Sequence, residues 1–405
     1  MSSPNPARGR KPKPKIKSQD IRGAKYLEQI LDVLASLHDH KSDLKRQLHY
    51  DEYCAWLLLY FFTPALDSMR GLQQVSGLKQ IRRKLRLPRF SLGSFSEAGC
   101  VFDPELLVPI MEQIEARLGD IESDTRLRGL NQRPTAVDGT LLHALPKMVW
   151  ALWRDEHNHA AKLHLQFDLL KGAPYQAELT CAQESETRAL ERQLEAGRLY
   201  VQDRGYFDFD LMASILKKGS SFVLRVRDNI VHEVVETKPI SAAAAKVGVE
   251  ADLIVRAGFR DPLELPLRLI RIKGEDSTCR VARVDSKTKS YRTHEIQHTL
   301  LLLTDRLDLD AELIGVLYRH RWQIELFFRW FKKVLQADKL LSLSENGMTI
   351  VVYCALIASM LVSLWSGRKP TKRTFEMICF YFSGWADEEE LREHLLRLEP
   401  VKTTS

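Results

Sequence analysis

The chain has 405 residues and 44% of them are hydrophobic, which predicts two or three domains with a large buried core and argues against disorder of the whole chain. Its 60 lysine and arginine residues outnumber 53 acidic residues, so the formal net charge is +7. Six cysteines without a Cys-x-x-Cys pair argue against a disulfide framework or a thiolate zinc site, and they fit a reducing cytoplasm.

Residues 1–20 are predicted to be a basic, disordered tail. The first 25 residues hold eight lysines and arginines against Asp20 alone, which equals the net excess of the chain. Four prolines among them prevent a packed core. Two interpretations stay open: the RGRKPKPK stretch binds polyanion, for example in a narrow DNA minor groove, or the tail only keeps the protein soluble. No apolar stretch follows, so a secretory signal is not expected.

Residues 21–128 are predicted to form a helical, DNA-binding N-terminal region. YLEQILDVLASLHD and DEYCAWLLLYFF place apolar residues at helical spacing. GLKQIRRKLRLPRFSLGSFSEA then predicts a basic helix, a break at Pro88, and a second helix capped by Ser91 or Ser94. This pattern is compatible with a helix-turn-helix-like reader that uses Arg82, Arg83 and Lys84. An ordinary surface helix with solvated basic side chains is the alternative.

From residue 129 to residue 227 the pattern changes to short strands that alternate with helices. We expect strands at RPTAVDGTLL, KLHLQFDLLKG, QAELTCAQ, RLYVQDRGYF and SSFVLRVRDN, and helices at TRALERQLEAG and over 207–218. The predicted order is β-β-β-α-β-α-β, which is a mixed α/β arrangement.

Residues 228–304 are predicted to be rich in β-strands. NIVHEVVET, DLIVRAGF, LPLRLIRIK, STCRVARV, SYRTHEI and HTLLLLTD are short and often alternating, and ISAAAAKVG is the one expected helix. Helices return over 305–366, first at 311–335. The uncharged segment Met348–Trp365 barely reaches the length of a membrane span, so we expect a helix buried in a protein core and no membrane association. Residues 367–405 are predicted to be a helical C-terminal region.

One acid stands among basic and aromatic residues on the helix 311–335. At about 100° per residue, Tyr318, Arg321, Glu325 and Lys332 fall within an arc of about 60°. The apolar face lies beside them and comprises Leu317, Ile324, Phe327, Phe331, Val334 and Leu335. A salt bridge between Arg321 and Glu325 explains one pair, but it leaves Tyr318 and Lys332 unexplained.

Converging carboxylates would give Glu325 a catalytic role. Phosphoryl transfer between oxygens uses two cations about 3.5–4 Å apart, and Mg²⁺ is held through a few carboxylates, substrate phosphate and water. Asp138 in TAVDGT and Asp203 in YVQDRGYF each follow an apolar strand. Taken alone, each is better explained as a turn or a helix cap. Their order, one on the first strand and one after the fourth, favours a shared site with Glu325.

With these residues in place, the chain resembles a known family. An aspartate on the first strand, an aspartate after the fourth and a glutamate on a later helix is the arrangement of RNase H-like DDE transposases. Tyr318, Arg321, Glu325 and Lys332 match the Tyr-(2)-Arg-(3)-Glu-(6)-Lys motif of bacterial insertion-sequence transposases. The flanking RWQIELFF and DRGYF are also similar to that family, and the resemblance covers residues 130–365.

The resemblance implies an α/β fold in which residues 129–227 and 305–366 form an RNase H-like mixed-sheet core, interrupted by the β-strand insertion 228–304. It implies a cut-and-paste transposase in which Asp138, Asp203 and Glu325 bind two Mg²⁺ or Mn²⁺ ions. Water would nick a strand, and the freed 3′-hydroxyl would attack the opposite strand or the target. Tyr318, Arg321 and Lys332 would contact phosphates of the transposon end.

The implied partners are double-stranded DNA, as terminal inverted repeats and target, and a second copy of the chain on paired ends. The implied location is the bacterial cytoplasm, with the nucleoid. Two alternatives remain open: an inactive, DNA-binding relative of such an enzyme, or an RNase H-like nuclease that cuts without joining.

Two further features bear on this interpretation. Relatives that pass through a DNA hairpin stack a flipped base on a tryptophan of the insertion. No tryptophan lies in 228–304, where Phe259 or Tyr291 could take its place. The histidines of HNHAAKLH, His157, His159 and His164, have no cysteine or fourth partner nearby, so strand or loop histidines are favoured over a zinc site.

Overall fold

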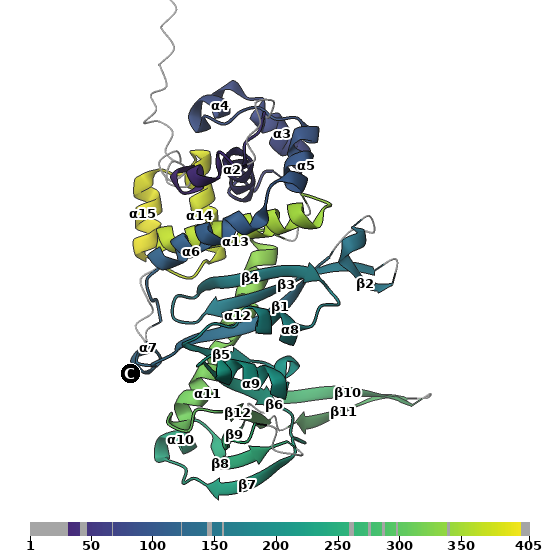
Figure 1. The fold of residues 1–405 in the computed structure, drawn as a ribbon, viewed down its shortest axis with the longest axis vertical. Helices are drawn as coiled ribbons and strands as arrows, with labels where there is room; N and C mark the ends of the chain where they lie inside the picture. Colours follow the sequence, from purple (N-terminus) through teal and green to yellow (C-terminus); the bar gives the residue numbers. More distant parts are fainter. Residues whose placement is uncertain are drawn as a thin grey trace, which may run out of the picture. The chain divides into compact units, whose positions relative to one another are not determined.

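The computed structural model shows a mixed α/β protein (Figure 1). It describes residues 31–40, 47–66, 68–122, 124–143, 148–155, 158–258, 263–273, 277–285, 288–296, 299–337 and 341–397. The basic tail therefore lies outside the described residues.

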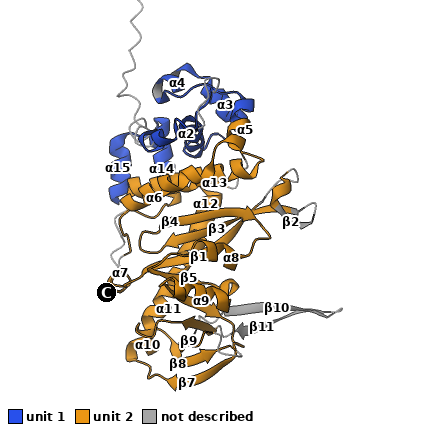
Figure 2. Cartoon of the chain, viewed as in Figure 1, with its two compact units in different colours: residues 1–95, 376–405 blue, residues 96–375 orange. Residues whose placement is uncertain are grey.

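Two compact units make up the chain (Figure 2). Residues 1–95 and 376–405 form unit 1, and residues 96–375 form unit 2. These limits differ from the sequence boundaries at 128 and 366, because residues 96–128 group with the sheet-containing unit rather than with the preceding helices.

Unit 1 is helical. Its elements are η2 (Ala35–Leu37), α2 (Tyr50–Phe61), α3 (Met69–Ser76), α4 (Lys79–Leu85), α15 (Glu388–Arg397), and parts of α5 (Leu92–Val101) and α14 (Lys372–Ser383). Helix α2 is buried on most of its surface because its apolar residues run around the whole helix. Tyr53 of α2 packs against Phe95 with ring centroids 4.6 Å apart. Ser91 accepts a 3.0 Å hydrogen bond from the Ser94 amide, so Ser91 is the cap of α5.

Unit 2 is built on a ten-stranded sheet with the order β2-β3-β1-β5-β6-β12-β9-β8-β7, in which β4 pairs with β3. The strands are β1 (Arg133–His143), β2 (Leu152–Asp155), β3 (Asn158–Asp168), β4 (Ala173–Cys181), β5 (Arg198–Gln202), β6 (Ser221–Val226), β7 (His232–Thr237), β8 (Val249–Ala257), β9 (Leu267–Lys273) and β12 (Thr299–Thr304). A separate two-stranded sheet pairs β10 (Ser277–Asp285) with β11 (Thr288–Ile296).

The helical elements of unit 2 lie between and around these strands. They are η3 (Pro104–Leu107), α6 (Val108–Arg117), α7 (Thr125–Arg128), η4 (Val149–Ala151), α8 (Glu186–Arg192), η5 (Arg204–Tyr206), α9 (Phe209–Lys217), α10 (Ala242–Lys246), α11 (Ala311–His320), α12 (Trp322–Lys333) and α13 (Glu345–Ser366). The expected strands and helices of 129–227 are thus present, together with β2, which the sequence analysis missed.

Strand directions confirm the predicted mixed α/β, RNase H-like fold class. In the set β4-β3-β1-β5-β6, the strands β4, β3 and β1 are antiparallel neighbours. The pairs β1/β5 and β5/β6 are parallel, and helices α8 and α9 supply the connections (Figure 1). The two parallel pairs bring the carboxyl ends of three strands to one edge of the sheet.

The stretch 228–304 extends this sheet. Strands β7, β8 and β9 form an antiparallel run, and β12 returns to pair with both β9 and β6. The chain therefore re-enters the central sheet beside β6 before α11 begins.

Helix α13 contains the uncharged segment Met348–Trp365. It is the one helix in the described part of the chain that is long and apolar enough to cross a membrane, and 94% of its most apolar window is buried inside the protein. Every residue from Gly347 to Ser363 is buried. The prediction of a buried core helix is confirmed.

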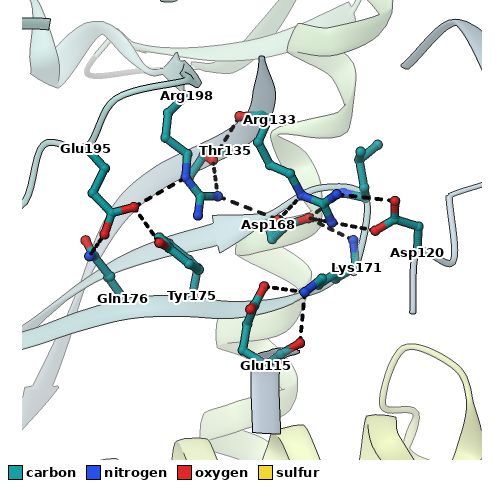
Figure 3. A network of polar contacts seen from close by, with 11 residues as sticks. Glu115, Asp120, Arg133, Thr135, Asp168, Lys171, Tyr175, Gln176, Glu195 and Arg198 are labelled. Atoms are coloured by element: carbon teal, nitrogen blue, oxygen red, sulfur yellow. Dashed lines mark hydrogen bonds and ion pairs between the residues drawn. The ribbon is translucent and has the colours of Figure 1, made fainter. Parts of the chain in front are cut away.

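A buried carboxylate ties together the ends of three strands (Figure 3). Asp168, 0% exposed, ends β3 and accepts a 2.6 Å hydrogen bond from Arg133 Nε at the start of β1. Arg198 Nη1 at the start of β5 lies 3.7 Å from the same carboxylate. Burial lowers the pKa of Arg133, but the hydrogen bonds that Arg133 donates to Asp120 and Asp168 outweigh burial, so the pKa is raised.

His164 is a buried strand residue. It lies on β3, and its Nε2 is 2.9 Å from Thr180 Oγ1 of β4. Burial, helped by the charges of Lys162 and Arg192, lowers the pKa of His164 to about 4. His159 bonds the Met148 carbonyl through Nδ1 at 3.0 Å, and His157 lies outside the described residues.

We expect His164 to make the protein less stable in acid. Between pH 6.5 and pH 4 the unfolded chain binds a proton on this imidazole and the folded chain does not, so the free energy of unfolding falls as the pH falls. The shift corresponds to about 3 kcal/mol once the pH is below 4. Urea unfolding of the wild type and of His164→Gln from pH 7 to pH 4 should give a shallower pH dependence for the variant. Parallel curves would contradict the prediction.

Candidate active site

The parallel pairing of β1 and β5 brings Asp138 and Asp203 together. Asp138 lies on β1, and Asp203 directly follows β5. The last register pair is Ala136 with Val201, and each aspartate lies two residues beyond its partner in that pair. Because side chains alternate along a strand, both carboxylates leave the same face of the sheet. The sheet therefore places at one edge two acids that are far apart in the sequence.

Arg321 links Asp138 to the third acid. Its Nη2 donates to Glu325 Oε1 at 2.5 Å, and its Nη1 lies 3.6 Å from Asp138 Oδ2. The Arg321 side chain is 8% exposed, so this guanidinium is largely shielded from solvent between the two carboxylates. Asp203 also acts on Arg321, since its charge helps to raise the pKa of that guanidinium.

The electrostatics of the site reflect burial. Burial raises the pKa of Asp138 to about 6, while Arg321 and a 2.8 Å hydrogen bond from the Gly139 amide act in the opposite direction. Burial lowers the pKa of Arg321, but Tyr318 and Glu325 outweigh burial and raise it overall. A guanidinium with a raised pKa stays charged, so it balances the carboxylates around it.

The helix that carries Glu325 is interrupted at Arg321. The sequence predicted one helix over 311–335, whereas α11 ends at His320 and α12 begins at Trp322. Hydrogen bonds from the Arg321 amide to the Tyr318 carbonyl and from the Ile324 amide to the Arg321 carbonyl, both 3.1 Å, form a tighter turn. The uniform 100° phase is therefore wrong between Tyr318 and Glu325.

The other two motif residues contact the neighbours of these carboxylates: Tyr318 lies beside Arg321, and Lys332 reaches the strand that carries Asp138. Tyr318 is 8% exposed, and its ring centroid lies 5.6 Å from Arg321 Cζ. Lys332 Nζ donates at 2.6 Å to the Leu141 carbonyl of β1, which lies three residues beyond Asp138. The apolar face is confirmed for Leu317, Ile324, Phe327, Phe331 and Leu335, which are all buried.

Glu186 is an acid of this site that the sequence analysis missed. Its carboxylate contacts two glycines: a Cβ on Gly139 would lie 3.0 Å from Oε1, and a Cβ on Gly205 would lie 3.3 Å from Oε2. Both glycines follow the predicted catalytic aspartates closely. A glycine within two residues of each aspartate, in the sequences DG and DRG, was the available sequence signal for this packing.

Tyr206 of DRGYF is buried beneath the same groups. Burial raises its pKa well above the ordinary value, and the nearby charges of Glu186, Asp138 and Asp203 add to this rise. Beside this loop lies a cavity of about 600 Å³, lined by Arg204, Phe207, Phe209 and Arg227 among others.

Carboxylate donors of this kind suit Mg²⁺ or Mn²⁺. Asp138, Asp203 and Glu325 offer oxygen ligands alone, which hard divalent cations prefer. Within the described part of the chain, no three His, Cys, Asp or Glu side chains come together as a ready-made metal site. The Arg321 guanidinium, rather than a close approach of the acids, joins Asp138 to Glu325 here.

Arg82, Arg83, Lys84, Phe259 and Tyr291 are the remaining residues that the sequence analysis singled out. Arg82 and Arg83 are exposed on the short helix α4, and the Lys84 side chain falls outside the described residues. Helix α3 precedes α4 and is separated from it by Gly77 and Leu78. Phe259 and the Tyr291 side chain, named as possible base-stacking groups, also lie outside the described residues.

Comparison with known proteins identifies relatives of this chain. A protein of Sinorhizobium fredii named as the transposase y4zB is 28% identical over 50% of this chain and 52% of its own length. A protein of Geobacillus stearothermophilus named as the transposase of insertion sequence element IS5377 is 24% identical over 59% of each chain. The chain thus matches about half to three-fifths of these relatives' lengths.

A third relative, of Synechocystis, is named as a transposase for insertion sequence element IS4SA and is 22% identical over 56% of this chain and 59% of its own. A solved piggyBac transposase synaptic complex with hairpin DNA aligns with a TM-score of 0.38 and 11% identity, over 96% of this chain and 85% of that chain. The family model described as "Transposase DDE domain" matches residues 130–361, which include Asp138, Asp203 and Glu325. Since that match covers more than half of the sequence, the chain belongs to the transposase DDE domain family.

Proposed function

We propose that this protein is a DNA transposase of an insertion sequence, which cleaves the element's DNA ends and joins them to target DNA. The observation that carries this proposal is that Asp138 and Asp203 both lie just beyond the last parallel pair of β1 and β5, with Glu325 of α12 linked to Asp138 through Arg321, inside the transposase DDE domain. The substrate class is double-stranded DNA that carries terminal inverted repeats.

Asp138, Asp203 and Glu325 would hold two divalent cations. When bound, Mg²⁺ or Mn²⁺ ions activate an attacking oxygen and stabilise the leaving oxygen of a phosphodiester. The three side chains supply the negative charge that such ions require, and the half-buried Asp138 side chain stays accessible to an ion from solution.

The basic residues of the site would bind phosphate. Arg321 presents a forked guanidinium that pairs with a carboxylate, and the same geometry suits a DNA phosphate. Lys332 Nζ lies at the end of β1 close to the same edge. Tyr318 is stacked near Arg321 and would orient it. In this proposal the Arg321 pair with Glu325 gives way to a phosphate when DNA binds.

The experiment uses the full-length protein and linear DNA that carries the inverted repeats flanking its gene. Mg²⁺ should give nicks at the repeat ends and, with a target plasmid, joined products, whereas EDTA should abolish both. Cleaved ends that never join would instead indicate a nuclease. Salt-dependent binding to the ends without any cleavage would indicate an inactive, DNA-binding relative.

We further propose that a homodimer holds two DNA ends in the bacterial cytoplasm, with the nucleoid. Paired cleavage requires both ends to be held at once. Light scattering of the protein with end DNA should give two protein chains and two DNA ends per complex. One protein chain per end at all concentrations would contradict the dimer.

Arg82 and Arg83 are proposed to contact DNA phosphates. Each contact that is lost should reduce the slope of log affinity against log salt by about 1. We therefore expect Arg82→Ala with Arg83→Ala to bind more weakly and to reduce the slope by up to about 2. Arg392→Ala with Arg397→Ala on exposed α15 is the charge-matched control. Fluorescence anisotropy from 50 to 300 mM salt measures both, and equal slopes for the two doubles would contradict the assignment.

A further inference from the structure

Glu186 lies where three parts of the candidate active site meet. It is the first residue of α8, which contacts β1, β3 and η5. Strand β1 carries Asp138, and η5 begins immediately after Asp203. No part of the function proposed above uses this carboxylate.

Its two oxygens occupy a notch made by two glycines. Gly139 borders Oε1 and Gly205 borders Oε2, at the short distances given above. Neither glycine has a positive φ, so their backbones are open to other residues. What the glycines provide is space, because a methyl group at either position would press on the Glu186 carboxylate. Gly139, which follows Asp138 on β1, and Gly205, two residues after Asp203, thus leave space for the Glu186 carboxylate.

The positive partner of Glu186 is loosely placed. Lys162 Nζ lies 3.5 Å from Glu186 Oε1 and donates at 3.1 Å to the Glu184 carbonyl. The Glu186 side chain is 30% exposed, so water can reach it. Because both of its oxygens border glycines that follow the two aspartates, Glu186 belongs to the candidate site, beyond an ion pair that anchors α8 to β3.

We propose that Glu186 is a fourth carboxylate of the divalent-cation site, a positioning residue that would attract the cation to the place between Asp138 on β1 and Asp203 after β5. This inference rests on the proposed function, because it assumes that a cation binds at these aspartates. Groups that orient metal-bound ligands or water commonly change metal affinity by about 10–100-fold. The glycine notch explains how a carboxylate reaches this place from α8.

The test measures Mn²⁺ binding by the full-length protein without DNA, from the loss of the free Mn²⁺ signal in electron paramagnetic resonance. Glu186→Gln keeps the size of the side chain and removes its charge. We expect it to weaken Mn²⁺ binding about tenfold. Glu184→Gln is the matched control, since it makes the same change two residues away on a carboxylate that pairs with Arg192, and it should bind like the wild type.

Further variants separate the possible outcomes. Gly139→Ala would place a Cβ 3.0 Å from Glu186 Oε1 and shift the carboxylate slightly, so it should weaken Mn²⁺ binding less than Glu186→Gln does. Glu186→Asp should restore part of the affinity lost in Glu186→Gln. Thermal melting confirms that each variant is folded.

If Glu186→Gln binds Mn²⁺ like the wild type while Asp203→Asn loses binding, Glu186 only fills space and the inference is overturned. If Asp138→Asn and Asp203→Asn also bind like the wild type, the proposed cation site itself is wrong.

Discussion

Replacing Asp138 or Asp203 by Asn, or Glu325 by Gln, is expected to lower cleavage of the DNA ends by about 10³-fold or more. Each change keeps the shape of the side chain and removes one charge that would hold a divalent cation. Cations at such sites supply several kcal/mol of transition-state stabilisation, and each 1.36 kcal/mol corresponds to about a tenfold change in rate. Single-turnover cleavage of labelled end DNA in Mg²⁺ measures the rates.

A control variant and a binding assay make this result specific. Glu312→Gln alters an acid in the first turn of α11, outside the site, and should leave the rate within about twofold of the wild type because such a surface change is usually small. The three site variants should still bind end DNA, since their basic residues remain. Cleavage at the wild-type rate by all three would remove these residues from catalysis.

Asp168→Ala is expected to destabilise the protein by about 3–5 kcal/mol, the usual cost of removing one partner of a buried ion pair. The Asp168 side chain is 1% exposed and also accepts hydrogen bonds of 2.9 and 2.8 Å from the Leu170 and Lys171 amides. Its loss leaves Arg133 and Arg198 without their shared carboxylate at the starts of the two parallel strands. Urea unfolding monitored by circular dichroism measures the change.

The control for Asp168→Ala is a variant that breaks a solvent-exposed ion pair. Glu393→Ala breaks the pair with Arg397 on α15, whose side chains are 54% and 78% exposed, and should cost less than about 1 kcal/mol. Asp168→Asn should lie between the two, because an amide oxygen can still accept the backbone hydrogen bonds. An Asp168→Ala variant as stable as Glu393→Ala would show that the network in Figure 3 contributes little.

Much of the fold was predictable because its signals are local. Alternation and turn residues located the strands from β5 to β12, and the uncharged length of 348–365 indicated the buried helix α13. Strand β2 was missed because four residues give too short a pattern. The break at Arg321 was missed because apolar periodicity continues through it, and the tighter turn shows only in the backbone hydrogen bonds.

For the candidate site, spacing and motif order suggested Asp138, Asp203 and Glu325. The structure shows the contacts of Arg321 that link Asp138 to Glu325. The contact of Lys332 with the Leu141 carbonyl spans 191 residues, so no local pattern could reveal it. Glu186 was overlooked because an acid in the first turn of a helix is commonly explained by the helix dipole. Its position is determined by close packing against two glycines.

Because β12 returns to the central sheet, sequence changes in the segment between β6 and β12 need not move the helices that follow it. Since β12 pairs with β6, the start of α11 is fixed by the sheet and not by the path of the chain from β7 to β11. Lengthening a loop costs little free energy, because the entropy of closure grows only with the logarithm of its length. The hairpin of β10 and β11, which forms a sheet of its own, can therefore be lengthened or shortened while β12 keeps its place beside β6 and β9. Changes in that hairpin leave the strands and helices that carry Asp138, Asp203 and Glu325 in place.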